Sequence, residues 1–225
     1  MKFEKTEGWG FEHAIRGMRN PLESWKKSDS IILMEQDENN DFREVAKIGK
    51  NDLELMHKLI KAGSEHRKFL RQIFVAVDIT APLYWWKEAD TYKVGTVSNS
   101  TSTMHKLAST PITMDCFEMD DFEDVKLSND KLKQEWDCSL CWDAIIGNCE
   151  VLRQKYNETK DKHYWKELIR LLPESWLQKR TITMNYENIL NMYRQRKHHK
   201  LTEWSKSFCD WVKNLPYAEE LICVE

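Results

Sequence analysis

The hydrophobic positions of this chain follow two spacings, and each spacing predicts one kind of element. Apolar residues three or four positions apart are typical of a helix with one buried face, whereas runs of β-branched and aromatic residues are typical of a buried strand. The helical spacing predicts helices over 51–63, 83–90, 131–158, 164–171, 186–195 and 202–214. The strand pattern covers 69–79 and 180–184.

Turn-forming residues divide these elements. Asn51-Asp52 and Thr202 are candidate amino-terminal caps, while Gly63 and Pro173 are expected to end helices and Pro82 to end a strand. Segments without either spacing are expected to be connections: 8–21, 35–41, 96–103 and 116–130. For 8–21, a short helix is the alternative. The pattern as a whole predicts a mixed α+β fold in which helices predominate.

Composition places the chain among globular proteins. It has 225 residues, enough for one domain with a substantial core, and is 41% hydrophobic and 32% charged. A net charge of −3 predicts no general attraction to nucleic acid or to anionic membranes, so any phosphate site needs a local group of Lys and Arg. No signal peptide and no run of about 20 apolar residues is visible, and we expect a cytoplasmic protein.

Cysteine and histidine spacing argues against a metal site. Six cysteines in a cytoplasmic protein are expected to be reduced. Cys138 and Cys141 have the CxxC spacing but no second pair at zinc-ribbon distance, so we interpret them as buried or half-buried thiols, with a zinc or redox role as the alternative. His198 and His199 are adjacent, so their side chains diverge on a helix, and no HExxH spacing exists.

Four segments carry candidate chemistry. The basic segment 61–71 is either a solvated edge or a cationic rim for phosphate. The aromatic segment 85–95 either packs its tryptophans inward or sandwiches a flat ring. The hydroxyl-rich segment 96–105 is a candidate ligand loop, because its backbone N–H and hydroxyl donors suit an anion. It lacks the GxSxG context of a hydrolase serine, so we reject a hydrolase triad. The cation cluster at 191–199 suits a helix carboxy terminus, where it favours the helix dipole.

The carboxy-terminal quarter carries a family resemblance. Leu171-Leu172-Pro173 is followed by the run 184–196, Met-Asn-Tyr-Glu-Asn-Ile-Leu-Asn-Met-Tyr-Arg-Gln-Arg, with Asn191 and Arg196 on neighbouring turns. Together with Glu65-His66 before a strand and the polar loop that follows, this order resembles the flavin-dependent thymidylate synthases (ThyX) from about Asn51 to Leu215. The resemblance implies a single ThyX-like domain over 1–225, with the segment 1–50 outside the matched part, and mostly helices packed on a small antiparallel or mixed sheet.

The resemblance also implies an activity and its site residues. Members of that family methylate dUMP to dTMP with methylenetetrahydrofolate and FAD, use NADPH as reductant, and form homotetramers with sites between subunits. It assigns Asn191 to the flavin and Arg196 to the pyrimidine, and it makes Arg196 and Ser102 the candidate catalytic residues. Ser102 and Asn99 are expected to bind the nucleotide phosphate, and His66 and Lys93 the flavin phosphates.

The signature of the family is altered in this chain. It contains Arg-His-Arg followed at fixed steps by Ser, Asn-Glu, Ser and Arg, and on Tyr92–His105 only Asn99 and Ser102 match it. Cations elsewhere are candidate replacements: Lys87, Lys93, Arg67 and Arg71. Two alternatives therefore stand beside the synthase: a non-catalytic nucleotide-binding or interaction module that keeps the fold, and a flavin enzyme acting on another pyrimidine nucleotide.

Overall fold

A computed structural model describes residues 1–36, 42–129 and 134–224 of the chain. Its residues group into two compact units. The first unit contains 1–79, 89–99 and 180–225, and the second contains 80–88 and 100–179. Because the chain passes between the units more than once, neither is a continuous stretch of sequence. No helix among the described residues is long and apolar enough to cross a membrane.

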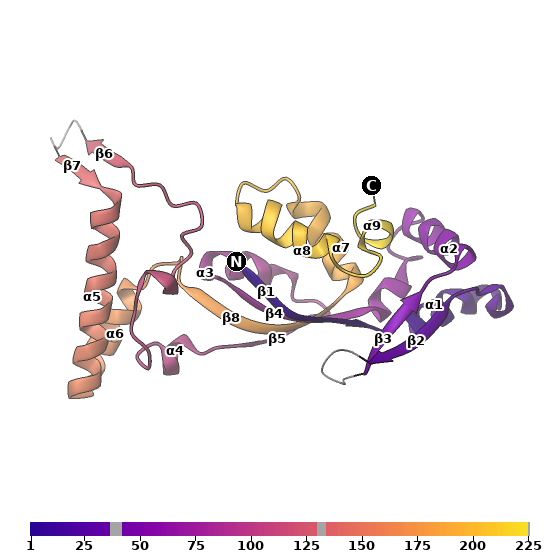
Figure 1. The fold of residues 1–225 in the computed structure, drawn as a ribbon, viewed down its shortest axis with the longest axis horizontal. Helices are drawn as coiled ribbons and strands as arrows, with labels where there is room; N and C mark the ends of the chain where they lie inside the picture. Colours follow the sequence, from indigo (N-terminus) through magenta and orange to yellow (C-terminus); the bar gives the residue numbers. More distant parts are fainter. Residues whose placement is uncertain (37–41, 130–133, 225) are drawn as a thin grey trace. The chain divides into compact units, whose positions relative to one another are not determined.

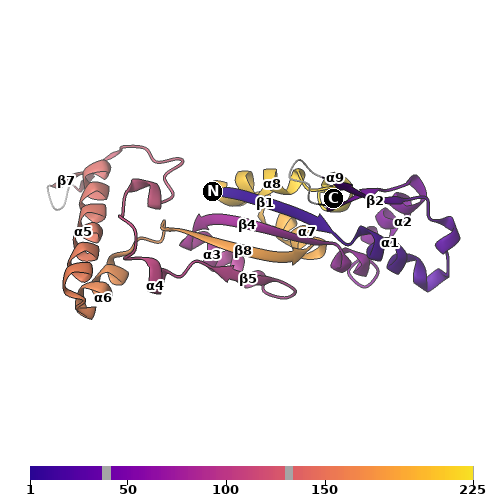
Figure 2. The same cartoon turned by 60° about the horizontal axis from the view of Figure 1, so that its bottom comes forward.

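The first unit is built on most of a small antiparallel sheet with the strand order β1-β4-β8-β5 (Figure 2). Its strands and helices are β1 (Lys2–Trp9), α1 (Phe11–Arg19), β2 (Ile31–Gln36), β3 (Phe42–Lys47), α2 (Lys50–Lys61), β4 (Phe74–Pro82), β5 (Val97–Ser100), β8 (Leu177–Asn185), α7 (Tyr186–Arg196), α8 (Cys209–Lys213) and α9 (Ala218–Leu221). Strands β2 and β3 form a separate antiparallel hairpin, in which Leu33 pairs with Val45.

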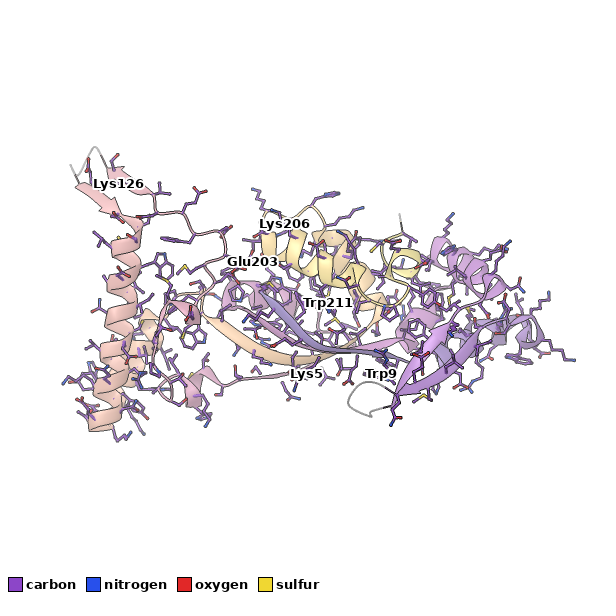
Figure 3. All side chains as sticks on the ribbon, in the orientation of Figure 1. Lys5, Trp9, Lys126, Glu203, Lys206 and Trp211 are labelled. Atoms are coloured by element: carbon purple, nitrogen blue, oxygen red, sulfur yellow. The ribbon has the colours of Figure 1, made fainter. Side chains whose placement is uncertain are left out.

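Helices α7 and α8 lie on one face of the sheet in the first unit (Figure 1). Strand β4 supplies the apolar surface beneath them, because its alternate residues Val75, Val77 and Ile79 are buried. Trp211, labelled in Figure 3, lies on α8. It stacks on Phe3 of β1 with ring centroids 4.9 Å apart, and its indole N–H donates to Thr6 Oγ1 at 3.0 Å. The final helices are therefore fastened to the first strand by aromatic packing.

Asp52 has a different role from the predicted helix cap. The residue at the cap position of α2 is Gly49, and Asp29 accepts hydrogen bonds from the first-turn amides of Asn51 and Asp52 at 3.0 and 3.2 Å. Asp52 itself is fully buried and accepts the Nε–H of Arg19 at 2.6 Å. Burying a carboxylate without a partner costs much free energy, and the ion pair with Arg19 avoids that cost.

The second unit packs helices around its own apolar core. Its elements are α3 (Leu83–Ala89), whose last residue belongs to the first unit, α4 (Thr103–Lys106), the hairpin β6 (Lys126–Asn129) and β7 (Gln134–Asp137), α5 (Cys138–Thr159) and α6 (Lys162–Leu171). Helices α5 and α6 lie side by side. The core residues are Leu107, Ile112, Phe117, Cys149 and Leu168.

Most predicted elements are present. Helices α2, α3, α6 and α7 and strand β8 lie where the spacing predicts them, and Pro82 is the last residue of β4. The segment 8–21 contains the short helix α1. The α+β class with a small antiparallel sheet is therefore confirmed. Residues 37–41 of one predicted connection and 130–133 of a predicted helix lie outside the described residues.

Four boundaries differ from the prediction for physical reasons. Residues 68–72 form a 3₁₀ turn in which only Phe69 and Leu70 are buried, so the strand begins at Phe74. The loop 96–103 contains the edge strand β5, and α5 begins only at Cys138. The segment 203–208 is π-helical and Thr202 gives no side-chain cap. Strands β1, β2 and β3 were not predicted, because their exposed positions break the alternation.

Candidate functional site

Helix α7 is the structural centre of the candidate site in the first unit. Asn185 and Asn188 form a reciprocal capping box at its start, at 3.0 and 3.2 Å, and the amide of Tyr186 donates to the carbonyl of Ile73 at 2.9 Å. Ile189, Leu190 and Met192 are buried on one side of the helix. The remaining positions therefore present amide, guanidinium and carboxylate groups on the other side.

Glu187 joins two arginines to the first turn of α7. Its Oε1 accepts the Nε–H of Arg67 at 3.2 Å, and its Oε2 accepts the Nε–H of Arg71. The side chains of Arg67 and Glu187 are 11% and 8% exposed, whereas that of Arg71 is 49% exposed. The hydrogen bond and charge of Glu187 raise the pKa of Arg71 further above its already high value. Two arginines and one glutamate leave one net positive charge here.

Arg67 also reaches the next turn of α7. Its Nη2 donates to Oδ1 of Asn191 at 3.3 Å. The amide nitrogen of Asn191 makes no hydrogen bond with any described residue, so it remains a donor for another molecule. Burial, followed by the charge of Arg67, lowers the pKa of the neighbouring Arg194.

Arg196 at the end of α7 lies between two aromatic rings. Its guanidinium carbon is 5.5 Å from the ring centroid of Tyr92 and 5.0 Å from that of Trp204. Its Nε–H donates to the hydroxyl of Tyr92 at 2.9 Å. Trp204 is fully buried in the π-helical segment, so one of the two rings is held rigidly by the core. Stacking and hydrogen bonding together orient the guanidinium plane.

The loop before β5 is fastened to α7 by its backbone and by Tyr92. The hydroxyl of Tyr92 donates to Gln195 at 2.9 Å, and the side-chain amide of Asn188 donates to the carbonyl of Val94 at 2.6 Å. Gly95 has φ +80°, and a Cβ there would come within 3.2 Å of Asn185 Nδ2. Glycine at 95 therefore permits both the turn and its close approach to the helix.

The structure brings four of the six predicted site residues to or beside α7. Asn191 and Arg196 are on the helix, His66 is exposed in the turn next to Arg67, and Lys93 is exposed next to Tyr92. Asn99 is exposed on β5 in the first unit. Ser102 belongs to the second unit, where its hydroxyl caps α4 by accepting the amide of His105 at 3.2 Å.

Sequence reasoning missed three contributors to this cluster. The sequence places Tyr92 in the aromatic segment 85–95 and among the departures from the family signature, Trp204 in a helix and Glu187 in the Asn-Arg run, but it assigns none of them a role beside Arg67 or Arg196. The partners of Arg67 and of Arg196 are 120 and 104 residues away in sequence. No local spacing signals such pairs. Two residues of the cationic rim predicted at 61–71, Arg67 and Arg71, lie in this cluster. Both are paired with the carboxylate of Glu187.

The structure also places Lys87, another cation considered for phosphate binding, and the two CxxC cysteines. Lys87 pairs with Glu174 at 2.7 Å in the second unit. Cys138 is half-buried, but Cys141 is exposed, so the expectation of a buried or half-buried thiol is wrong at position 141. Within the described ranges, no group of three or more His, Cys, Asp or Glu side chains is placed to hold a metal ion.

No protein-family model matches the sequence, and no curated protein matches it either. The fold, in contrast, is that of the flavin-dependent thymidylate synthases. Two solved structures of ThyX from Helicobacter pylori, both complexed with FAD and dUMP, match over essentially the full length. One is 16% identical, with a TM-score of 0.64 and 100% of both chains covered. The other is 17% identical, with a TM-score of 0.65 and 99% and 97% of the two chains covered.

Proposed function

We propose that the α7 cluster binds FAD and a pyrimidine nucleotide, and that the chain is a flavin-dependent thymidylate synthase-like enzyme. The proposed reaction is the reductive methylation of dUMP to dTMP, with methylenetetrahydrofolate as one-carbon donor and NADPH as reductant. The observation that carries the proposal is the arrangement on α7. Asn191 and Arg196 lie five residues apart on a helix of a ThyX-like fold, and each is oriented by a residue distant in sequence.

The donor groups of the cluster fit the chemistry of a flavin nucleotide. The unused amide N–H₂ of Asn191 suits a ring carbonyl, and the half-exposed guanidinium of Arg71 suits a diphosphate. One net positive charge remains after Glu187 is counted. Bound FAD would supply hydride transfer, while the chain would bind, orient and exclude water. His66 and Lys93, both exposed beside this cluster, are the further candidates for flavin phosphate contacts.

Arg196 is the proposed contact to the pyrimidine. A guanidinium held in one plane can donate hydrogen bonds to a ring carbonyl of a uracil base. Holding it between Tyr92 and Trp204 before the ligand arrives lowers the entropy lost on binding. Ser102 and Asn99 remain the proposed phosphate contacts, and Arg196 and Ser102 the proposed catalytic residues. The homotetramer and the single ThyX-like domain over 1–225 are further parts of this proposal, and the full-length match supports the single domain.

Two features favour the alternatives. Tyr92 stands where the family signature begins with arginine, and Glu187 neutralises part of the charge of Arg67 and Arg71. Both reduce the positive charge available to two phosphate-bearing ligands. A non-catalytic nucleotide-binding module, or a flavin enzyme acting on another pyrimidine nucleotide, would need fewer such contacts.

The deciding experiment combines a spectrum with a turnover assay. FAD is added to the purified full-length protein, and the visible absorption is recorded before and after dUMP. A flavin spectrum that dUMP perturbs, with tritium released from [5-³H]dUMP when methylenetetrahydrofolate and NADPH are added, supports the synthase. Binding without release supports the non-catalytic module, and perturbation by another pyrimidine nucleotide alone supports the third function. Absence of FAD binding contradicts the proposal.

Two substitutions with a matched control locate the ligands. Asn191→Ala is expected to weaken FAD binding, and Arg196→Gln to weaken dUMP binding, each about tenfold, because one oriented polar contact is lost. Lys200→Gln also removes a positive charge just beyond α7, but from an exposed position outside the cluster. It is expected to leave both affinities unchanged. Equal effects of Arg196→Gln and Lys200→Gln on dUMP affinity would refute the role of Arg196. Light scattering of the same sample tests the tetramer.

A further inference from the structure

A cavity lies in the amino-terminal part of the first unit and shares no residue with the α7 cluster. Its volume is about 280 Å³, just below the range of about 300–1,000 Å³ typical of small-molecule sites. The residues that line it come from α1 and from the segment leading into β2: Glu12, Ile15, Arg16, Arg19, Trp25, Ser28, Ser30 and Ile32. A ligand of one or two rings matches this size.

The walls of this cavity are held in place by hydrogen bonds. Asp52 Oδ2 accepts the hydroxyls of Ser28 and Ser30, each at 2.7 Å, and the amide of Ser30 at 3.1 Å. The hydroxyl of Ser30 in turn accepts the amide of Gly49 at 3.0 Å. Because a buried carboxylate organises this wall, the cavity is part of the folded structure rather than a gap between mobile side chains.

Arg19 supplies a buried positive charge to the cavity. It is 4% exposed, its Nε–H is bound by Asp52, and its Nη1 makes long hydrogen bonds of 3.3 and 3.4 Å to Ser24. Its Nη2 makes no hydrogen bond with any described residue. A ligand oxygen in the cavity could accept a hydrogen bond from this nitrogen, and the fixed positive charge of Arg19 would strengthen that bond.

The rest of the lining defines the ligand further. Trp25 is 49% exposed, and its indole N–H is fixed by Asn20 Oδ1 at 2.9 Å, so its ring is an oriented stacking surface. Ile15 and Ile32 provide apolar walls, and Arg16 adds a second cation. Glu12 opposes a doubly charged anion such as a phosphate monoester, but one negative charge is balanced by Arg16.

We propose that this cavity is a binding site for a small aromatic carboxylate, with the carboxylate at Arg19 and Arg16 and the ring on Trp25. A flat monoanion matches the planar guanidinium, the stacking surface and the volume together. This proposal does not depend on the function of the α7 cluster.

The test uses 4-fluorobenzoate as probe and ligand-observed ¹⁹F NMR on the full-length protein. We expect a Kd of about 0.1–1 mM, as for a compact ligand of about ten heavy atoms. Trp25→Ala and Arg16→Gln, both at exposed positions, are each expected to raise this Kd about fivefold or more by removing one stacking or ionic contact. Arg19→Lys keeps a positive charge for Asp52 but loses the forked donor, and is expected to abolish binding.

Matched controls decide whether the site is specific. Trp9→Ala removes another exposed tryptophan, and Lys26→Gln another exposed cation near the cavity, and neither residue lines it. Both are expected to leave the Kd unchanged, and fluorobenzene, which lacks the carboxylate, is expected to bind at least about tenfold more weakly. The proposal is overturned if 4-fluorobenzoate does not bind, if the controls weaken it equally, or if dUMP displaces it. Circular dichroism of each variant confirms that it is folded.

Discussion

The Nε–H of Arg196 donates a hydrogen bond of 2.9 Å to the hydroxyl of Tyr92, and the guanidinium stacks on the ring of the same tyrosine. The hydroxyl of Tyr92 in turn donates to Gln195 of the same helix at 2.9 Å. A second arginine at 92 would repel Arg196, whereas tyrosine holds it. Tyr92 and Arg196 therefore form one local arrangement at the end of α7.

Removing only the hydroxyl of Tyr92 tests this arrangement. Tyr92→Phe is expected to weaken dUMP binding about fivefold while costing about 1 kcal/mol of stability, because Arg196 loses its hydrogen-bond acceptor but keeps the ring. Titration calorimetry measures the affinity and thermal unfolding the stability. Tyr164→Phe is the control, since its hydroxyl makes no hydrogen bond with the described residues. An unchanged dUMP affinity in Tyr92→Phe would show that the hydroxyl does not orient Arg196 for the ligand.

Neutralising Glu187 should separate stability from cofactor affinity. Glu187→Gln leaves the poorly exposed Arg67 without a carboxylate and is expected to cost about 1–3 kcal/mol of unfolding free energy. The same change raises the net charge of the cluster by one, so FAD affinity is expected to rise about threefold to tenfold at low salt. Denaturant unfolding and FAD fluorescence quenching measure the two effects.

The control for this substitution is Glu174→Gln, which breaks the well-exposed pair with Lys87. That pair is expected to contribute at most about 1 kcal/mol. Weaker FAD binding in Glu187→Gln would show that Glu187 positions Arg67 and Arg71 for the ligand rather than competing with it.

Glu150 in the second unit should make the stability pH-dependent. Its carboxylate accepts both Nε and Nη2 of Arg153, at 2.7 and 2.6 Å, and the amide of Ile112 at 2.8 Å. The hydrogen bond from Arg153, chiefly, lowers the pKa of Glu150 to about 2, although burial opposes this. Because the folded pKa is depressed, its stabilisation is fully present above the unfolded pKa of about 4.3 and is lost as pH falls through about 2.

Glu150→Gln is therefore expected to lower the unfolding free energy by about 2–3 kcal/mol at neutral pH, and the difference from the unsubstituted protein should shrink between about pH 4.5 and 2. Urea unfolding at a series of pH values measures this. The exposed Asp143, changed to Asn, is the control and should show no such convergence. A difference that stays constant with pH would argue that Glu150 acts by packing rather than by charge.

The cysteines should differ sharply in reactivity. Cys149 is fully buried, and burial raises its pKa to about 11, whereas Cys141 is exposed. Because the thiolate is the reactive form, a thiol-specific disulfide reagent at about pH 8 should label Cys141 rapidly and Cys149 only after unfolding. Peptide mass spectrometry at short labelling times identifies the sites, and Cys141→Ser should remove the fast phase. Fast labelling at Cys149 would indicate that the core of the second unit opens readily.

The sequence alone determined the elements whose stability is local. Helices α2, α6 and α7 follow from apolar residues at helical spacing, and β8 follows from a run of β-branched residues. The Asn191–Arg196 spacing also survives intact, because two positions on one helix keep a constant separation. The ThyX-like α+β class could be predicted for the same reason, since the order of elements is a property of the chain.

Tertiary structure alone decided which side chains meet. Asp52 has the composition of a cap, yet burial beside Arg19 made it an ion-pair partner. Residues 68–72 form a 3₁₀ turn that packs against α1, and this packing buries Phe69 and Leu70 without the alternation of a strand. The pairs Arg67–Glu187 and Tyr92–Arg196 join residues more than 100 positions apart. Their energies depend on distance, burial and dielectric environment, and those exist only once the chain has folded.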